Sequence, residues 1–459
     1  MKSRLLRRLS IGAASLAMLL SVVTPGALAA HRTAAQRTAT HAKAPVTLIW
    51  FMRIEPKENP WENERVAAFQ KLNPGIKIKL ILAPNPNGQF DTKFNTLLNS
   101  TPADIWSHLG QAGFADYYHR NLLYNMSTLI KQYGYDFGST PKNLINTYNI
   151  GGNIYGIPSI TLGSFLYYNK DIFDAYNRAH PSAKLAYPPV SWTDKSWTWA
   201  KMVSYATKLT DPSKHQYGIL QGLFPYMGYA YLEGTDMFPA GAYQSGTPKT
   251  FNTTSPAIED IFQQMADWAN KSHIAPSYSD QKSAGNNAID LFSTGKIAME
   301  FTGGWGFRNY NSVSFHWAAA AMPTLKSNKD VLFTDPYMMY KGTAHPKEAF
   351  QFIKFLTNRD SMNSYVREVS FTPSNPDFLG LWYQLNSQRT GLTVAQLQTL
   401  VAGARANGQE SPNHLIVNFS EIHNRMVQDL DPIFFGQKTA KDQMPTVQQD
   451  VQSVLQQTR

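Results

Sequence analysis

The chain of 459 residues contains no cysteine. This absence excludes disulfide bridges, thiolate nucleophiles and cysteine metal sites. It also excludes an anchor built on a lipidated N-terminal cysteine. The fold must therefore be held together by its apolar residues, which make up 43% of the chain. A chain of this length exceeds one ordinary hydrophobic core and favours two or three lobes.

The sequence also lacks the local motifs of common enzymes. It contains no glycine-rich phosphate loop, no G-x-S-x-G elbow and no H-E-x-x-H motif. The 11 histidines form no cluster with carboxylates of the kind that binds a metal. No motif singles out a carboxylate pair for glycoside hydrolysis. We expect no enzyme, no cofactor and no metal, and a secreted glycoside hydrolase is the enzymatic alternative.

Charged residues are scarce, at 16% of the chain, and the formal net charge is +10. Four of the basic residues lie at the very start of the chain, at Lys2, Arg4, Arg7 and Arg8. No dense basic run follows them. A nucleic-acid-binding surface requires clustered Lys and Arg on a recognition fold. Nucleic acid is therefore not an expected partner.

Residues 1–29 have the layout of a secretory signal peptide, with a basic start, an apolar run at 11–23 and a small-x-small site at Ala27-Leu28-Ala29. The apolar run is shorter than the roughly 20 residues that span a bilayer. We expect cleavage after Ala29, with an uncleaved anchor as the alternative. Residues 30–44 carry no large apolar side chain and predict a flexible leader. The expected location is extracytoplasmic, in the periplasm or at the cell surface.

After residue 45 the apolar pattern alternates between strand and helix periods. Residues 46–51 predict a buried strand, and Asn59 followed by Pro60 predicts the start of a helix that ends near Asn73-Pro74-Gly75. Such alternation favours an α/β fold with mostly parallel sheets. The other predicted strands are 76–80, 103–106 and 164–168, and the other predicted helices are 91–98, 114–119, 171–176, 199–209, 258–268, 345–356 and 447–455.

Four pairs of segments, taken in order, carry a family resemblance. The chain resembles the extracellular solute-binding proteins of ABC sugar importers, family 1, which are maltose-binding-protein-like, over nearly all of its length after residue 45. The segments are GNIYGIP at 152–158 with YYNKDIF at 167–173, SWTW at 196–199 with KLT at 208–210, GKIAM at 295–299 with GGW at 303–305, and HPKEAF at 345–350 with FIKFL at 352–356.

The resemblance implies a two-lobed, periplasmic-binding-protein-like α/β fold with discontinuous lobes and a multi-strand hinge. Lobe 1 is then expected at 45–157 plus 322–370, and lobe 2 at 161–320 plus 372–459. Crossings between the lobes are expected near Pro158, near Met322-Pro323 and near Phe371-Thr372-Pro373.

The implied function is to bind a sugar or oligosaccharide in the cleft between the lobes, as a monomer, and to deliver it to the permease subunits of an ABC importer. The alternative within this fold is a polyol or glycerol phosphate ligand.

A sugar site needs flat aromatic rings against C–H faces and hydrogen-bonding groups around the hydroxyl edge. Trp305 follows Gly303-Gly304 and matches the family's sugar-stacking tryptophan. Tyr226 matches a ligand-contacting tyrosine, although Phe224 stands where the family has a glutamate. The resemblance and chain position add further ligand-binding candidates: Tyr229, Glu233, Trp106, His108, Gln111, Arg53, Glu55, Trp61, Asp335 and Tyr337. Trp382 lies in a segment that is longer than in relatives, and we assign it no role.

Overall fold

The computed structural model describes residues 45–54, 59–84, 89–107, 112–222, 224–287 and 289–457. The signal peptide and leader predicted within residues 1–44 lie outside this part of the chain. The rest forms one unit that spans Ala44–Arg459. Within the described ranges, no helix has both the length and the apolar character of a membrane span.

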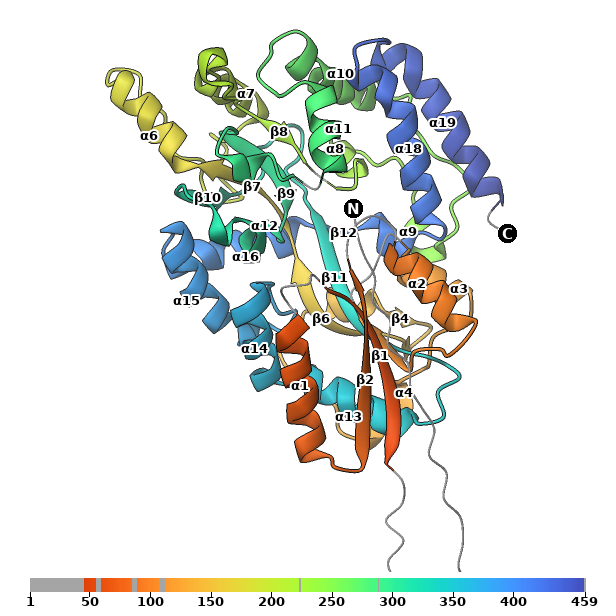
Figure 1. Cartoon of the computed structure of the whole chain (residues 1–459). Coiled ribbons are helices and arrows are strands. Elements are labelled where there is room, and N and C mark those ends of the chain that lie inside the picture. Colours follow the sequence, from red (N-terminus) through yellow and green to blue (C-terminus); the bar gives the residue numbers. More distant parts are fainter. Residues whose placement is uncertain are drawn as a thin grey trace, which may run out of the picture. The chain divides into compact units, whose positions relative to one another are not determined.

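The first sheet has six strands in the order β12-β11-β3-β1-β2, with β6 paired to β11 (Figure 1). Strand β1 is parallel to β2 and β3, as the sequence predicts. Strand β11 is antiparallel to both β3 and β6 and parallel to β12. The strands are β1 (Val46–Ile54), β2 (Ile76–Pro84), β3 (Ile105–Ser107), β6 (Ile157–Leu162), β11 (Val331–Met339) and β12 (Gln409–Glu410).

Successive side chains of β1 point to opposite faces of this sheet, and the side chains on both faces enter a hydrophobic core. Leu48 and Trp50 enter one core, which α13 (Pro346–Leu356) completes with Phe352. Ile49 and Phe51 enter a second core on the other face. The helices and the short hairpin of this half are α1 (Asn59–Leu72), α2 (Gln89–Leu98), α3 (Phe114–His119), α4 (Ser127–Gln132), α5 (Lys142–Asn146), β4 (Asn149–Ile150) and β5 (Asn153–Ile154).

The second sheet has four strands in the order β10-β7-β9-β8. Strand β7 (Ser164–Asn169) is antiparallel to both β9 (Met299–Gly303) and β10 (Trp317–Ala320). Only β8 (Leu220–Gln221) and β9 run parallel. The expectation of mostly parallel strands is therefore wrong here. The physical reason is the path of the chain. Strand β7 runs away from the end of β6, and β9 runs in the opposite direction, so that the last residue of β9, Gly303, lies opposite the first residue of β7, Ser164.

A third, larger core surrounds the second sheet and contains Trp382, whose indole N–H donates to the Ser370 carbonyl at 2.7 Å. Trp382 is thus a core residue. The helices of this half are α6 (Lys170–Ala179), α7 (Trp199–Leu209), α8 (Met227–Leu232), α9 (Ala242–Ser245), α10 (Pro256–Asn270), α11 (Tyr278–Asn286), α12 (Gly306–Asn309), α14 (Arg359–Val369), α15 (Leu379–Thr390), α16 (Val394–Asn407), α17 (Pro412–Leu415), α18 (Phe419–Phe434) and α19 (Ala440–Gln457).

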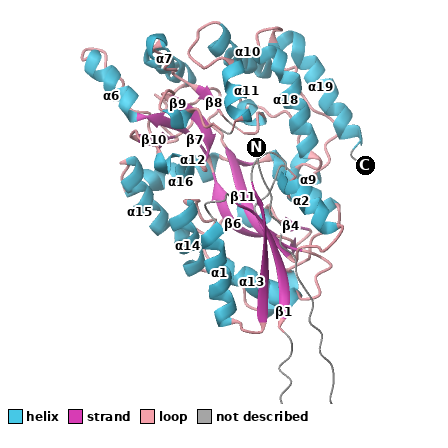
Figure 2. Ribbon diagram, viewed as in Figure 1, coloured by secondary structure: helices cyan, strands magenta, loops and turns pink. Residues whose placement is uncertain are grey.

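Strands β6 and β11 run on from the first sheet towards the second (Figure 2). The segment 370–374 lies beside β6, because the Thr161 N–H donates to the Thr372 carbonyl and the Ser374 N–H donates to the Ser159 carbonyl, both at 2.9 Å. We call β6, β11 and 370–374 the crossing segments. The predicted lobe boundaries stay a prediction. They assign α14 to lobe 1, whereas its buried side chains pack in the third core, around the second sheet.

Asp330 lies fully buried at the start of β11 and supports the turn before β7. Its Oδ2 accepts a hydrogen bond from the Ser164 N–H at 3.0 Å. Its Oδ1 has no hydrogen-bond partner within the described ranges. Burial raises the pKa of Asp330 well above its ordinary value of 3.8. A buried carboxyl of this kind holds its proton because the charged form is poorly solvated.

Asp330→Asn should therefore become relatively more stable as the pH rises. The folded protein keeps a proton that the unfolded chain releases above its ordinary pKa, so the contribution of Asp330 to stability falls as pH rises towards its folded pKa. The amide removes that titration. Urea unfolding of both proteins between about pH 5 and about pH 8 measures this, because the free energy of unfolding changes with pH wherever the folded and unfolded states bind different numbers of protons. A difference between variant and wild type that does not change with pH would contradict the assignment.

Candidate functional site

Four side chains from separate elements form an aromatic cluster beside the crossing segments. We define the aromatic cluster as Phe224, Trp305, Phe333 and His423. The ring of Trp305 meets that of Phe333 edge-on at 5.1 Å between centroids. Phe224 stacks on Phe333 at 6.0 Å and meets His423 edge-on at 5.0 Å. The cluster therefore joins β11, α18, the start of α12 and the loop before α8.

Trp305 differs from the other tryptophans of the protein. It is only partly buried, whereas every other tryptophan side chain that the structure describes is 0–7% exposed. Its indole N–H donates to Thr302 Oγ1 at 3.0 Å. A Cβ on Gly303 would lie 2.3 Å from the indole ring, so the ring can lie against the backbone only because residue 303 is glycine. Gly303 thus allows the close approach of the ring, and the Gly304 N–H donates to the Gly163 carbonyl.

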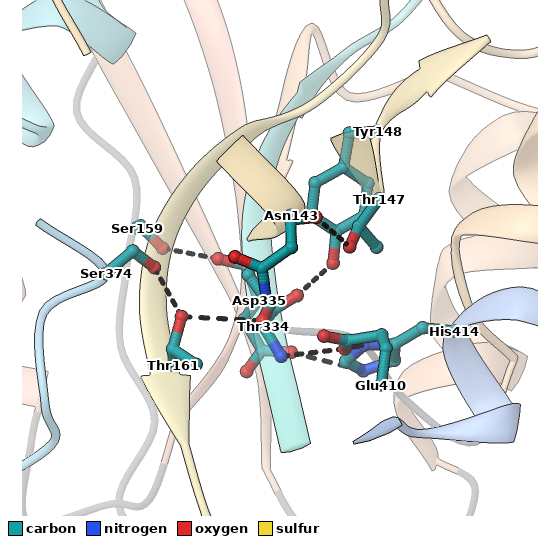
Figure 3. Close-up of polar contacts among 10 residues, drawn as sticks. All are labelled: Asn143, Thr147, Tyr148, Ser159, Thr161, Thr334, Asp335, Ser374, Glu410 and His414. Atoms are coloured by element: carbon teal, nitrogen blue, oxygen red, sulfur yellow. Dashed lines mark hydrogen bonds and ion pairs between the residues drawn. The ribbon is translucent and has the colours of Figure 1, made fainter. Parts of the chain in front are cut away.

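Asp335 lies two residues after Phe333 on β11, and its carboxylate lies near His414 (Figure 3). His414 Nε2 lies 3.5 Å from Asp335 Oδ1, and His414 Nδ1 lies 2.5 Å from Glu410 Oε1. Glu410 Oε1 also accepts the Thr334 N–H at 2.9 Å. His414 is buried and packs edge-on against Phe333 at 6.2 Å. This polar group links β12 and α17 to β11.

Further hydrogen bonds tie the crossing segments together (Figure 3). The Tyr148 hydroxyl donates to the Thr334 carbonyl, and Ser159 Oγ donates to the Asp335 carbonyl at 2.8 Å. The hydroxyls of Thr161 and Ser374 lie 2.8 Å apart. Buried polar groups that satisfy one another in this way fix a geometry, because separating them leaves unpaired groups in a dry interior. The aromatic cluster therefore rests on a well-defined polar support.

The structure places several predicted site residues within packed cores. Trp106 is fully buried between Phe94 and Tyr117, at ring distances of 5.0 and 5.5 Å. Tyr229 is also fully buried. Tyr337 is buried and lies 6.4 Å from the ring of Trp50. These rings have packing roles in this structure, and their predicted ligand contacts stay predictions.

The remaining candidates stay predictions, and the structure describes only some of them. Tyr226 precedes α8, and burial raises the pKa of its phenol to about 12. The buried Glu233 forms an ion pair with Lys326 at 2.7 Å. Arg53 and Trp61 lie on β1 and α1, where their side chains are not described. Glu55, His108 and Gln111 fall outside the described ranges.

His423 is a candidate that the sequence did not suggest to us. It lies on α18 one turn after Phe419, and the two rings stack at 6.0 Å. Its Nδ1 is buried and has no hydrogen-bond partner within the described residues. Burial lowers the pKa of the imidazole to about 4, so the ring is neutral at neutral pH. A polar residue on the apolar stripe of Phe419, Ile422 and Met426 is the signal that could have identified it.

The described residues contain no group of three or more His, Asp or Glu side chains arranged to hold a metal ion. The polar triad of Asp335, Glu410 and His414 is instead internally paired through short contacts. The site can thus offer aromatic surface, a neutral imidazole and a network of hydroxyls and carboxylates.

Comparison with known proteins identifies the family and the fold. The family model for bacterial extracellular solute-binding proteins matches residues 55–363. The maltodextrin-binding protein MdxE of Bacillus subtilis is 23% identical over 259 residues, which is 54% of this chain and 57% of that protein. The match thus spans less than two thirds of that relative's length.

Two solved structures have the same two-lobed α/β fold. The ABC substrate-binding protein Lmo0181 from Listeria monocytogenes, in complex with cycloalternan, aligns with a TM-score of 0.75 at 18% identity, over 90% of this chain and 99% of that one. Maltose-bound MalE3 of T. maritima aligns with a TM-score of 0.68 at 16% identity, over 90% and 100%. Family and fold are those of binding proteins. With a family model that covers well over half of its length, this chain belongs to the bacterial extracellular solute-binding proteins.

Proposed function

We propose that this protein captures a neutral sugar or oligosaccharide outside the cytoplasm and hands it to the permease of an ABC importer. The observation that carries the proposal is the partly exposed Trp305, held over Gly303 beside Phe224 and Phe333, in a protein whose other described tryptophans are all buried. Burying a large ring is favourable, so a tryptophan kept partly in solvent is typical of a binding surface.

The chemistry of the aromatic cluster suits a sugar. An aromatic ring offers an apolar face to the C–H groups of a pyranose. The neutral His423 imidazole can exchange one hydrogen bond with a hydroxyl, because its Nδ1 is unused within the described ranges. The relatives support this ligand class, since one is named for maltodextrin and two structures contain cycloalternan and maltose.

A phosphate-bearing ligand fits the cluster less well. A phosphate requires guanidinium or ammonium groups aimed at it. The described polar side chain that packs on Phe333 is His414, which is paired with the carboxylates Asp335 and Glu410. The cation Arg405 is engaged, because it donates to the carbonyls of Pro373 and Ser374. Arg308, the cation next along the chain from Trp305, lies over the ring of Phe371 at 5.0 Å. Polyol binding remains the second candidate within this fold, because a polyol offers hydroxyls without charge.

In the proposed cycle the ligand holds the two lobes closed. It can do so only through contacts that it makes in the closed arrangement and not in the open one. Release to the permease then requires the lobes to reopen. No covalent bond is made or broken.

Titration calorimetry with maltotriose, cycloalternan, glycerol and glycerol 3-phosphate tests the ligand class. We expect heat only from the saccharides and no new reducing ends after long incubation. Saturable binding of glycerol 3-phosphate alone would contradict the proposal, as would hydrolysis of the saccharides.

His423→Leu should weaken saccharide binding by about tenfold, the loss of about one hydrogen bond with a buried group. His423→Asn should retain more of the affinity, because an amide can still exchange a hydrogen bond. Since the imidazole has a pKa of about 4, wild-type affinity should not change on this residue's account down to about pH 5. Calorimetry at two pH values measures both effects, and equal affinity in wild type and His423→Leu would remove His423 from the site.

A further inference from the structure

A cavity of about 510 Å³ lies apart from the aromatic cluster. Its walls come from α3, the end of α5, the β4–β5 turn, α9 and Leu415 of α17. None of Phe224, Trp305, Phe333 and His423 lines it. The cavity has the size of ordinary small-molecule sites, which range over roughly 300–1,000 Å³.

The walls of this cavity belong to two different cores. Phe114 and Tyr118 pack in the second core, with Ile49 and Phe51 of the first sheet, whereas Tyr243 packs against the third core, around the second sheet. The two sides come close at Gly246, where a Cβ would lie 3.0 Å from His119 Nε2. The Val417 N–H holds this loop by donating to the Gly246 carbonyl at 2.8 Å. An occupant would therefore contact both halves of the protein.

The cavity is lined by aromatic rings and unused neutral polar groups. Phe114 and Tyr118 stack at 6.1 Å and 28°. Among the described contacts, the side chains of Tyr118, Asn146, Asn149 and Gln244 have no hydrogen-bond partner within the protein, and all four line the cavity. Tyr118 and Asn149 are half-buried, whereas Asn146 and Gln244 are exposed to solvent. Amides and a phenol can both donate and accept, which is the pairing that sugar hydroxyls require.

Charge is nearly absent from the lining. The described lining residues include no Lys, Arg, Asp or Glu, and His119 is the one ionisable side chain apart from the tyrosines. The nearby Asp116 does not line the cavity: its Oδ1 accepts the Asn418 N–H at 2.9 Å, and its Oδ2 is buried without a hydrogen-bond partner among the described residues. The Tyr243 hydroxyl is likewise engaged, since it donates to Asp236. A charged ligand would find no counter-ion here, so the cavity suits a neutral polar molecule with an apolar face.

We propose that this cavity is a second carbohydrate site, which takes a neutral mono- or disaccharide between α3 and α9. The sugar's C–H face lies on the half-buried ring of Tyr118, against which the buried Phe114 stacks, and its hydroxyls pair with Asn146, Asn149 and Gln244. The site is independent of Trp305, so it does not rest on the function proposed for the aromatic cluster.

Ligand-observed saturation-transfer NMR with maltose tests the second site in a Trp305→Ala background, where the first site is weakened. We expect maltose signals to persist in Trp305→Ala. Adding Asn146→Ala and Gln244→Ala should weaken the remaining binding about fivefold or more, as expected for lost hydrogen bonds. The matched control adds Asn143→Ala and Thr247→Ala, which are exposed neighbours on α5 and after α9 that do not line the cavity.

The proposal is overturned if Trp305→Ala abolishes every maltose signal at millimolar sugar. It is also overturned if the lining pair and the control pair give equal signals. Failure of the first site is read separately, from calorimetry on wild type and Trp305→Ala, so the two results do not depend on one another. Thermal unfolding of each variant verifies that it is folded.

Discussion

Trp305→Ala should weaken saccharide binding by at least about tenfold, the loss of one good aromatic contact. The thermal unfolding of the ligand-free protein should change little by comparison. The ring is only partly buried, and its polar contact is a single hydrogen bond to Thr302. Its removal therefore leaves no large closed cavity in a core. Calorimetry gives the affinity, and differential scanning calorimetry gives the stability.

Trp382→Ala is the matched control for this result. Trp382 is buried, bonds to the Ser370 carbonyl and meets Phe307 edge-on at 4.7 Å. Its truncation should cost about 3–5 kcal/mol, as for other buried tryptophans. Trp305→Phe should retain part of the affinity, because a ring face remains. A loss of ligand-free stability in Trp305→Ala as large as that in Trp382→Ala would show that Trp305 serves the core instead.

Gly113→Ala should be among the most disruptive small substitutions in the protein. Gly113 precedes α3, and a Cβ there would lie 1.8 Å from the Asn413 carbonyl oxygen and 2.6 Å from His414 Cα. Both are backbone atoms, so no side-chain rotation relieves the overlap. The substitution must separate α3 from α17 or strain both, at a cost of about 3 kcal/mol or more, the upper range for overpacking.

Urea unfolding measures the loss in Gly113→Ala, and small-angle scattering detects any separation of the elements. Gly75→Ala is the control, because no atom lies within 4 Å of a Cβ at that glycine. If both variants unfold at the same urea concentration, the contact between α3 and α17 is not a fixed part of the fold.

Much of the local structure could be predicted from sequence periodicity. The predicted helix at 199–209 is α7, and the strand at 46–51 falls within β1. The signals were local, such as Asn59-Pro60 at the start of α1 and the apolar positions of the helix at 199–209. A signal that we did not use is Thr198 before α7, whose side chain accepts the Lys201 N–H. Strand direction in the second sheet was not predictable in this way, because it depends on where the chain returns and not on the pattern within any strand.

The candidate site could be predicted only in part, for a related reason. Gly303-Gly304 indicated a close approach to the backbone, and in the structure the Trp305 ring lies against Gly303. An aromatic residue elsewhere gives no such local sign. Trp106 is enclosed by Phe94 and Tyr117, which come from other elements, so its burial cannot be inferred from its neighbours in the chain. The burial of His423 likewise involves a residue far away in the chain, Phe224, whose ring meets the imidazole edge-on.

The core that Trp50 and α13 form on one face of the first sheet is built from distant parts of the chain, and this affects how the chain folds during synthesis. Trp50 of β1 lies 5.1 Å from Phe352 of α13, and the two residues are separated by most of the sequence. That core cannot form until the ribosome has released α13, so the N-terminal part must wait as an incomplete, collapsed chain. Contacts of such long sequence separation slow folding and expose apolar surface meanwhile. Nascent chains of this protein should therefore depend on chaperones until late in translation.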